Sequence, residues 1–275
     1  MKKSLSIIVA SLVAASSLMA APIKEVVMSK DVKWTHLNPK RGDLAPSAGT
    51  LWGDRNANVP TGYLLKPNDG FQSPPHIHNI SYRAVVISGL LHNDDPNAEN
   101  MWLGTGSFWT QPKGTVHITS SKAGTKAIAY IEIEEGPYLV LPPKEAFHND
   151  DQPLNLDKSN VVWLDSKDVK WIDANNNVKV SYLWKDKNGF NGTFIKLPAK
   201  FSGKIKMKGT ELRGIVVDGK PQYTLAKNDV KTLEPGSYFG SKDGATSHHI
   251  KTNSEKETIL YIRTNGRYSI VSDKK

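Results

Sequence analysis

The sequence has 275 residues, 16 Pro, 21 Gly, no cysteine and a formal net charge of +9. Without cysteine the chain can form no disulfide and can carry no lipid on a cysteine near its N-terminus. Lys and Arg are spread along the chain and form no basic block interleaved with aromatic residues, so the composition argues against a nucleic-acid-binding protein.

The first twenty residues have the pattern of a cleaved secretory signal. Lys2 and Lys3 precede an apolar stretch at 5–18, and Leu18-Met19-Ala20, which ends in a small residue, forms a cleavage site. The apolar stretch is shorter than the roughly 20 residues that a membrane-spanning helix needs. We therefore expect removal of residues 1–20 near Ala20. The mature protein, which loses two lysines and so carries +7 instead of +9, should be periplasmic or secreted, without a membrane anchor.

The rest of the chain carries an internal duplication. The hexapeptide SKDVKW occurs at 29–34 and again at 166–171, which suggests the start of each copy. Downstream, the matches settle near a separation of 130 residues: RAVVISG at 83–89 with RGIVVDG at 213–219, and GSFW at 106–109 with GSYF at 236–239. Each copy has the size of an ordinary domain, so we expect an N-terminal domain at 21–155 and a C-terminal domain at 156–275.

Both copies consist of short segments of strand-forming residues separated by Gly, Pro, Asn and Asp. Examples are TGYLLKP at 61–67, YRAVVISG at 82–89 and KAIAYIEI at 126–133 in the first copy, and GTFIKL at 192–197, LRGIVVDG at 212–219 and ETILYIRT at 257–264 in the second. Long segments with helical periodicity are not evident. The pattern predicts an all-β sandwich or barrel in each copy.

Candidate metal ligands are concentrated in the first copy. His76 and His78 lie two residues apart, and residues i and i+2 of a strand point to the same face. His117, from a distant strand, could complete three sides of a divalent metal. Three imidazoles with open positions suit Fe, Zn, Mn or Ni, and indicate a reactive site more than a closed structural one. The alternative is that the pair is merely two surface histidines.

The stretches GFQSPPHIHNISYRAVVISG (70–89) and GSFWTQPKGTVH (106–117) resemble the paired motifs of the cupin superfamily in their glycines, proline, histidines and separation. Cupins are double-stranded β-helix or jelly-roll domains. The resemblance implies tandem cupin domains of a class of secreted bacterial bicupins, and it brings a fold and a metal but no substrate.

One position departs from the cupin pattern, because Tyr82 stands where cupins usually have a Glu ligand. A phenol with its pKa near 10 is a poorer ligand unless the metal lowers that pKa. Tyr82 could ligate the metal, transfer a proton or donate a hydrogen bond beside a three-histidine metal, or only fill space. We favour the second role and take Tyr82 as the candidate catalytic residue.

The second copy lacks the histidine pair. At a separation of 130 residues, Lys206 and Lys208 stand where His76 and His78 stand, while two histidines at 248–249 fall near the position of the third. Ammonium groups cannot coordinate a cation. We therefore expect a degenerate site and a structural role for the second copy.

Other side chains near the motifs have two possible roles. Gln72 and His92 are further polar candidates near the mouth of the site, or ordinary surface groups. Aromatic residues could line a ligand pocket or belong to the core: Phe71, Trp102, Phe108 and Trp109.

The leading hypothesis is a periplasmic metal-dependent enzyme that acts on a small molecule, with an oxygenase-like reaction and with isomerase, lyase or hydrolase chemistry left open. The competing hypothesis is a non-catalytic module that binds a small molecule or a carbohydrate and carries a structural metal. A third is a metal-stabilised scaffold for assembly, and a homodimer is possible.

Overall fold

A computed structural model of the chain describes residues 23–173, 177–244, 246–253 and 255–273. The candidate signal segment, 1–20, lies outside these residues. Regular structure in the described part is almost entirely β, with four short 3-10 helices: η1 (Ser29–Asp31), η2 (Pro39–Leu44), η3 (Pro143–Glu145) and η4 (Lys158–Asn160). None of its helices is long and apolar enough to cross a membrane.

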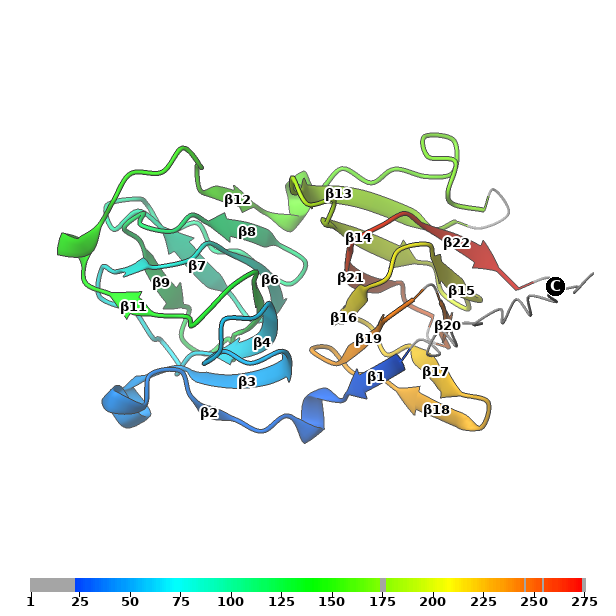
Figure 1. The fold of residues 1–275 in the computed structure, drawn as a ribbon, viewed down its shortest axis with the longest axis horizontal. Helices are drawn as coiled ribbons and strands as arrows, with labels where there is room; N and C mark the ends of the chain where they lie inside the picture. The colour runs from blue at the N-terminus through cyan, green and yellow to red at the C-terminus, as the bar shows by residue number, and fades with distance from the viewer. Residues whose placement is uncertain (1–22, 174–176, 245, 254, 274–275) are drawn as a thin grey trace, which may run out of the picture.

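The strands form two β-barrels that lie side by side (Figure 1). The first barrel combines a seven-stranded sheet, in the order β12-β8-β6-β10-β4-β3-β2, with the two-stranded ladders β7-β9 and β11-β5. Its strands are β2 (Thr35–His36), β3 (Ser47–Trp52), β4 (Thr61–Lys66), β5 (Ile77–His78), β6 (Tyr82–Ser88), β7 (Leu91–Asp94), β8 (Phe108–Gln111), β9 (Ile118–Ser121), β10 (Ile128–Ile133), β11 (Val140–Leu141) and β12 (Leu154–Leu156).

The second barrel combines a six-stranded sheet, in the order β1-β19-β16-β21-β14-β13, with a five-stranded sheet, β18-β17-β20-β15-β22. Its strands are β1 (Ile23–Val27), β13 (Lys179–Lys185), β14 (Asn191–Leu197), β15 (Ser202–Met207), β16 (Leu212–Asp218), β17 (Gln222–Ala226), β18 (Asp229–Thr232), β19 (Tyr238–Lys242), β20 (Ser247–Lys251), β21 (Thr258–Thr264) and β22 (Tyr268–Ser272).

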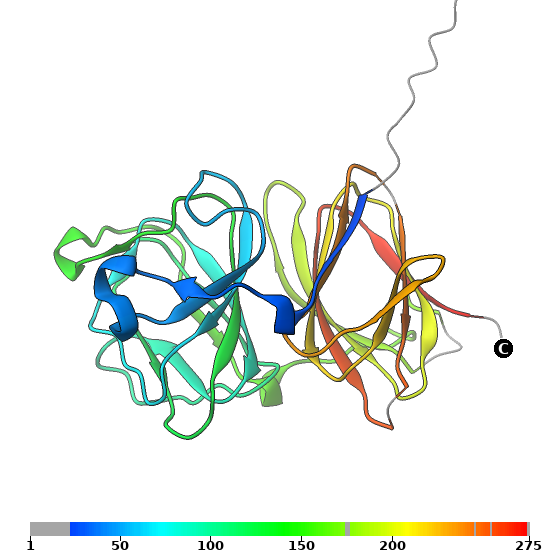
Figure 2. The same ribbon diagram turned by 90° about the horizontal axis from the view of Figure 1, so that it is seen from below.

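The two copies exchange their first strands. Strand β1 precedes the first barrel in the chain but pairs with β19 at the edge of the second (Figures 1 and 2). Strand β12 precedes the second barrel and pairs with β8 at the edge of the first. Each exchanged strand covers an edge that would otherwise expose unpaired backbone groups. The segment 23–27, which the sequence analysis assigned to the first domain by its place in the chain, thus belongs to the sheet of the second barrel.

The repeated hexapeptide does not mark equivalent positions in the two copies. The backbone N–H of Ser29 donates to Ser237 Oγ, and the matching contact in the other copy is made by Lys158 with Ser107 Oγ, both at 3.0 Å. The structural counterpart of SKDVKW at 29–34 is therefore KSNVVW at 158–163, at a separation of 129 residues, one less than that of the later matches.

The tryptophans at the end of these two segments confirm this assignment. Lys66 lies 4.3 Å from the ring centre of Trp34, and Lys196 lies 4.3 Å from that of Trp163. The tryptophan of the second SKDVKW, Trp171, instead packs on Tyr268 in the second barrel. Identity between the two hexapeptides therefore misplaced the start of the second copy by several residues.

Three apolar clusters account for the packing. One fills each barrel, and the third lies between the two large sheets and contains residues of both copies. In this third cluster, Trp52 Nε1 donates to Tyr130 OH (3.1 Å), and Trp184 Nε1 donates to Tyr261 OH (2.9 Å). The large sheets thus pack face to face, and the interior of each barrel is left to its own side chains.

Candidate metal centre

The three candidate histidines converge inside the first barrel. His78 lies in β5, His76 immediately precedes it, and His117 immediately precedes β9. Two backbone hydrogen bonds join the segments, from His76 N–H to His117 C=O (3.1 Å) and from His117 N–H to His76 C=O (3.0 Å). One ring nitrogen of each histidine lies within 4.8 Å of the others. Among the described residues, this is the one group of His, Cys, Asp or Glu with such a geometry.

Backbone carbonyls fix the orientation of all three rings. The Nδ1 atoms lie 2.9 Å from Pro74 C=O for His76, 2.9 Å from Leu139 C=O for His78 and 3.1 Å from Thr115 C=O for His117. A carbonyl oxygen can only accept, so each Nδ1 must carry the proton and each Nε2 must present a lone pair. This outer-shell arrangement is typical of histidines that bind metals.

The Nε2 atom of His117 is buried and has no hydrogen-bond partner among the described residues. A buried acceptor without a partner costs free energy, and a metal ion at this point would satisfy it. The donor set of three neutral imidazoles suits Fe, Mn, Zn or Ni. The residues present therefore fit a divalent transition metal.

Burial keeps these imidazoles neutral. It lowers the pKa of His117 to about 3, with a further contribution from the charge of His76. Burial is also the main cause of the lowered pKa of His78, which falls well below its usual value. For His76, burial lowers the pKa, the hydrogen bond to Pro74 opposes this, and the positive charge of Arg41 lowers it further. At neutral pH no proton competes with a metal for these nitrogens.

Tyr82 borders the site, but its hydroxyl points to a hydrogen-bond network. It donates to Asn93 Oδ1 (2.8 Å), which also accepts from Thr119 Oγ1 (2.7 Å). Its ring centre lies 5.3 Å from that of His78 and 6.2 Å from that of His117. Burial raises the pKa of Tyr82 and so favours the neutral phenol. The catalytic role of Tyr82 stays a prediction.

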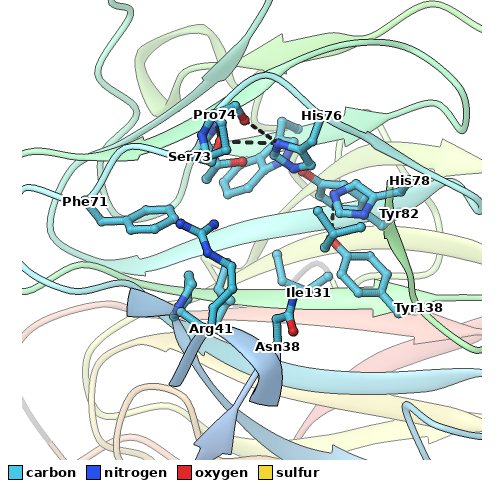
Figure 3. Close-up of a pocket in the computed structure, with 16 residues that line it drawn as sticks. Asn38, Arg41, Phe71, Ser73, Pro74, His76, His78, Tyr82, Ile131 and Tyr138 are labelled. Carbon is cyan, nitrogen blue, oxygen red and sulfur yellow. Dashed lines mark hydrogen bonds between the residues drawn. The ribbon is translucent and has the colours of Figure 1, made fainter. Parts of the chain in front are cut away.

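A second phenol, Tyr138, which no motif of the sequence indicates, lies closer to the metal ligands. Tyr138 OH is 2.9 Å from Nε2 of His78, and the two rings stack with centres 4.3 Å apart (Figure 3). Tyr138 follows the cis peptide between Gly136 and Pro137. No regular spacing links it to the histidine motif, so only its place in the GPYLVLP segment could have drawn attention to it.

The pocket in front of the histidines has a volume of about 80 Å³. Its lining is mostly apolar and includes Phe71, Trp109, Ile131 and Val140, with Arg41 and Asn38 from the N-terminal segment at its mouth (Figure 3). The other side chains considered from the sequence lie elsewhere. His92 is buried and accepts a hydrogen bond from Met101 N–H, Phe108 belongs to the cluster between the sheets, and Gln72 and Trp102 do not line the pocket.

The described residues of the second barrel form no equivalent site, but the lysines are not the reason. His76 pairs with His117 in the first barrel, and Ile205 pairs with His248 in the second. The positions that point inward are therefore Ile205 and Met207, while the lysines at 206 and 208 are exposed. The expected alignment was wrong by one residue, and a one-residue shift moves every side chain of a strand to the other face.

A single histidine remains inside the second barrel. His248 is fully buried and lies 2.8 Å from Tyr223 OH through Nδ1 and 3.1 Å from Ser241 Oγ through Nε2. Both ring nitrogens are engaged with protein groups, unlike Nε2 of His117. Loss of the metal site thus follows from Ile205 and Met207, which offer no imidazole.

Comparisons with known proteins agree with this fold. A family model described as "Domain of unknown function (DUF4437)" matches residues 25–271. Among curated proteins, none matches the chain. Similar solved structures include a proposed dioxygenase from Nostoc punctiforme, with a TM-score of 0.64 and 15% identity over 92% of this chain and 87% of that one.

Two further structures extend the comparison. Salicylate 1,2-dioxygenase from Pseudoaminobacter salicylatoxidans, described in adducts with gentisate, has a TM-score of 0.60 and 12% identity over 90% of this chain and 85% of its own. Oxalate decarboxylase from Bacillus subtilis, described with Mn(II) centres, has a TM-score of 0.53 and 13% identity over 90% and 78%. The fold is therefore that of a tandem cupin, as the motifs predicted.

Proposed function

Because the chain belongs to the family of the domain of unknown function DUF4437 and folds as a tandem cupin, we propose that it is a mononuclear-metal enzyme that acts on a small molecule. The metal ligands are His76, His78 and His117. The convergence of three neutral, buried imidazoles, of which His76 and His78 line a small pocket, carries the proposal. The dioxygenase and the Mn(II)-containing decarboxylase with this fold support it by analogy.

A divalent metal in this site would supply a Lewis acid and, if it were iron or manganese, a redox centre for an oxygenase-like reaction. The protein's own groups do the rest. The carbonyls of Pro74, Leu139 and Thr115 hold the imidazoles in the ligating tautomer. The apolar lining excludes bulk water, which strengthens electrostatic interactions inside the pocket. Tyr138 OH lies 2.9 Å from Nε2 of His78 and would have to give up this contact to a metal on that nitrogen, which would leave it free to donate a hydrogen bond beside the reacting group.

The small pocket favours an enzyme over a carbohydrate-binding module. Pockets for drug-sized ligands usually have volumes of about 300–1,000 Å³, whereas this one has about 80 Å³. An oligosaccharide would not fit in front of the histidines. A substrate of a few non-hydrogen atoms would.

The test has two readouts, metal content and conversion. Protein reconstituted with Fe(II), Mn(II), Zn(II) or Ni(II) is expected to bind about one equivalent of metal. His117→Gln should lose it, whereas His248→Gln, which changes the corresponding residue of the second barrel, should retain it. Conversion of small acids, alcohols and ketones under air, followed by NMR and by oxygen uptake, should require the metal. Stoichiometric metal without conversion of any compound would favour the binding module.

We also propose that the enzyme acts outside the cytoplasm, after removal of residues 1–20. The support is the sequence pattern of the signal, because this segment lies outside the described residues. Mass spectrometry of protein from a periplasmic fraction should give a mature chain that begins near Ala21. A full-length chain in the cytoplasmic fraction would contradict the proposal.

A further inference from the structure

The pocket of the metal centre contains one permanently charged side chain, Arg41. It belongs to η2, whose first turn is capped by the side chain of Asn38. Figure 3 shows its guanidinium beside Phe71, on the side of the pocket opposite His76 and His78.

Arg41 has no anionic partner in the described part of the chain. The acid of the same turn, Asp43, lies 3.5 Å from His36 instead, and no described carboxylate forms an ion pair with Arg41. Asp and Glu are also absent from the residues that line the pocket. The guanidinium therefore faces the pocket with its hydrogen-bond donors available.

The net charge of the pocket indicates the charge of the ligand that it binds. Three neutral imidazoles contribute no negative charge, so a bound divalent cation would keep its full charge, and Arg41 adds one more. The hydroxyl of Tyr82 is a neutral donor to Asn93 and cannot compensate. Arg41 is exposed at the mouth, so water solvates its charge in the free protein, but the charge of a metal on the buried histidines would be less screened. No lining residue is Asp or Glu, so both positive charges favour a ligand that brings an anionic group.

The pocket volume limits the size of this anion. By the same kind of measure, one water molecule needs roughly 10–15 Å³, so a pocket of about 80 Å³ has room for roughly five to eight water-sized positions. A metal ion and an acid of a few carbon atoms would fill it. The apolar faces of Phe71 and Trp109 would pack against the carbon part, and the fork of the guanidinium matches the two oxygens of a carboxylate.

We propose that the substrate is a small carboxylate anion, which Arg41 recognises from the mouth of the pocket, opposite His76 and His78. This inference rests on the proposed metal centre and names the substrate class of that site.

The test uses Mn(II)-loaded protein with formate, acetate and pyruvate as probes. Bound Mn(II) speeds the relaxation of the probes' protons, and the amides formamide, acetamide and pyruvamide serve as neutral analogues of the same size. At least one acid should bind, and its amide should bind at least 10-fold more weakly. Arg41→Gln should weaken the acid at least 10-fold, and Arg41→Lys should recover part of the loss. The matched control is Lys40→Gln, which removes the same charge from the neighbouring exposed residue that does not line the pocket.

The failures can be told apart. If free Mn(II) measured by EPR shows that the wild-type protein binds no metal, the proposed function fails and the inference fails with it. If Mn(II) binds but none of the acids does, the substrate class is wrong and the metal centre stands. The same conclusion holds if amide and acid bind equally well, or if Arg41→Gln behaves as Lys40→Gln does.

Discussion

The guanidinium carbon of Arg83, in the first barrel, lies 3.6 Å from the ring centre of Trp184 in the second. The equivalent residues make the reciprocal contact, because Arg213 in the second barrel lies 4.9 Å from the ring centre of Trp52 in the first. Between them, the buried carboxylate of Glu132 lies 3.5 Å from Arg83. The barrels therefore share one polar network, in addition to the exchanged strands.

Arg83→Gln should destabilise the whole chain. Glu132 would lose one of its cations while it stays buried, and breaking a buried ion pair is strongly destabilising. Because Arg263 also compensates this carboxylate, we expect a loss of about 2–4 kcal/mol in the free energy of unfolding, measured in urea. Lys220→Gln, which breaks an exposed pair with Glu234, should cause no measurable change. Equal behaviour of the two variants would refute the role of the network.

Glycines beneath the interface tryptophans should be irreplaceable. A Cβ on Gly192 would lie 1.9 Å from Trp184 Nε1, and one on Gly62 would lie 2.1 Å from Trp52 Nε1. Gly192→Ala should therefore lower the free energy of unfolding by about 2 kcal/mol or more, because the indole must move. At Gly104, the nearest atom to an added Cβ lies at 3.5 Å, so Gly104→Ala should be nearly neutral. The melting temperatures of both variants, measured by thermal unfolding, test this prediction. An unchanged melting temperature for Gly192→Ala would contradict the close packing.

The two phenols near the metal centre should differ in their effect on metal binding. Tyr138 OH lies 2.9 Å from a proposed ligand atom of His78, whereas Tyr82 OH donates to Asn93. Nε2 of His78 has one lone pair, so a metal there must displace the hydrogen bond from Tyr138 OH. Because removing this competing donor leaves the lone pair free, we expect Tyr138→Phe to bind Mn(II) at least as tightly as wild type, and Tyr82→Phe to differ from wild type by less than about 3-fold, measured by titration. Weaker binding in Tyr138→Phe would contradict this, and weaker binding in Tyr82→Phe would favour ligation by Tyr82.

His248 should make the protein sensitive to acid independently of any metal. Burial lowers its pKa to about 3, from an ordinary value near 6.5. Between these values the unfolded chain binds a proton that the folded chain does not, so this residue reduces stability as the pH falls below about 6.5. Above that pH both states are neutral and it has no such effect.

The difference between wild type and His248→Gln reports this contribution. In metal-free protein, acidification from pH 7 to pH 5 should reduce the stability of wild type by about 2 kcal/mol more than that of the variant. Urea unfolding at the two pH values measures it. Parallel losses in both proteins would show that His248 does not remain neutral in the folded state.

Much of the first barrel could be predicted from the sequence. The period of two in a strand correctly put His76 and His78 on one face, and the motif spacing brought His117 to them. The fold class followed from the same motifs. These predictions succeeded because they depend on local spacing and on strand geometry.

The features that the sequence misplaced or did not indicate depend on strand register and on contacts between distant segments. Sequence identity favoured the second SKDVKW at 166–171, although the equivalent segment is 158–163. Between the positions of His78 and Tyr82, the second copy has one residue more than the first. An alignment without this extra residue exchanges the inward and outward positions of β15. Tyr138 and Arg41 reach the pocket from segments outside both motifs, and no periodicity connects them with the histidines.

The central claim is that His76, His78 and His117 hold one metal ion. X-ray absorption at the zinc edge of Zn(II)-loaded protein tests it most directly. The account predicts three imidazole ligands at about 2.0–2.1 Å, with the outer-shell scattering of their rings, and loss of this spectrum in His117→Gln, which should no longer hold the metal. A metal surrounded by oxygen alone, or a spectrum unchanged in His117→Gln, would contradict it.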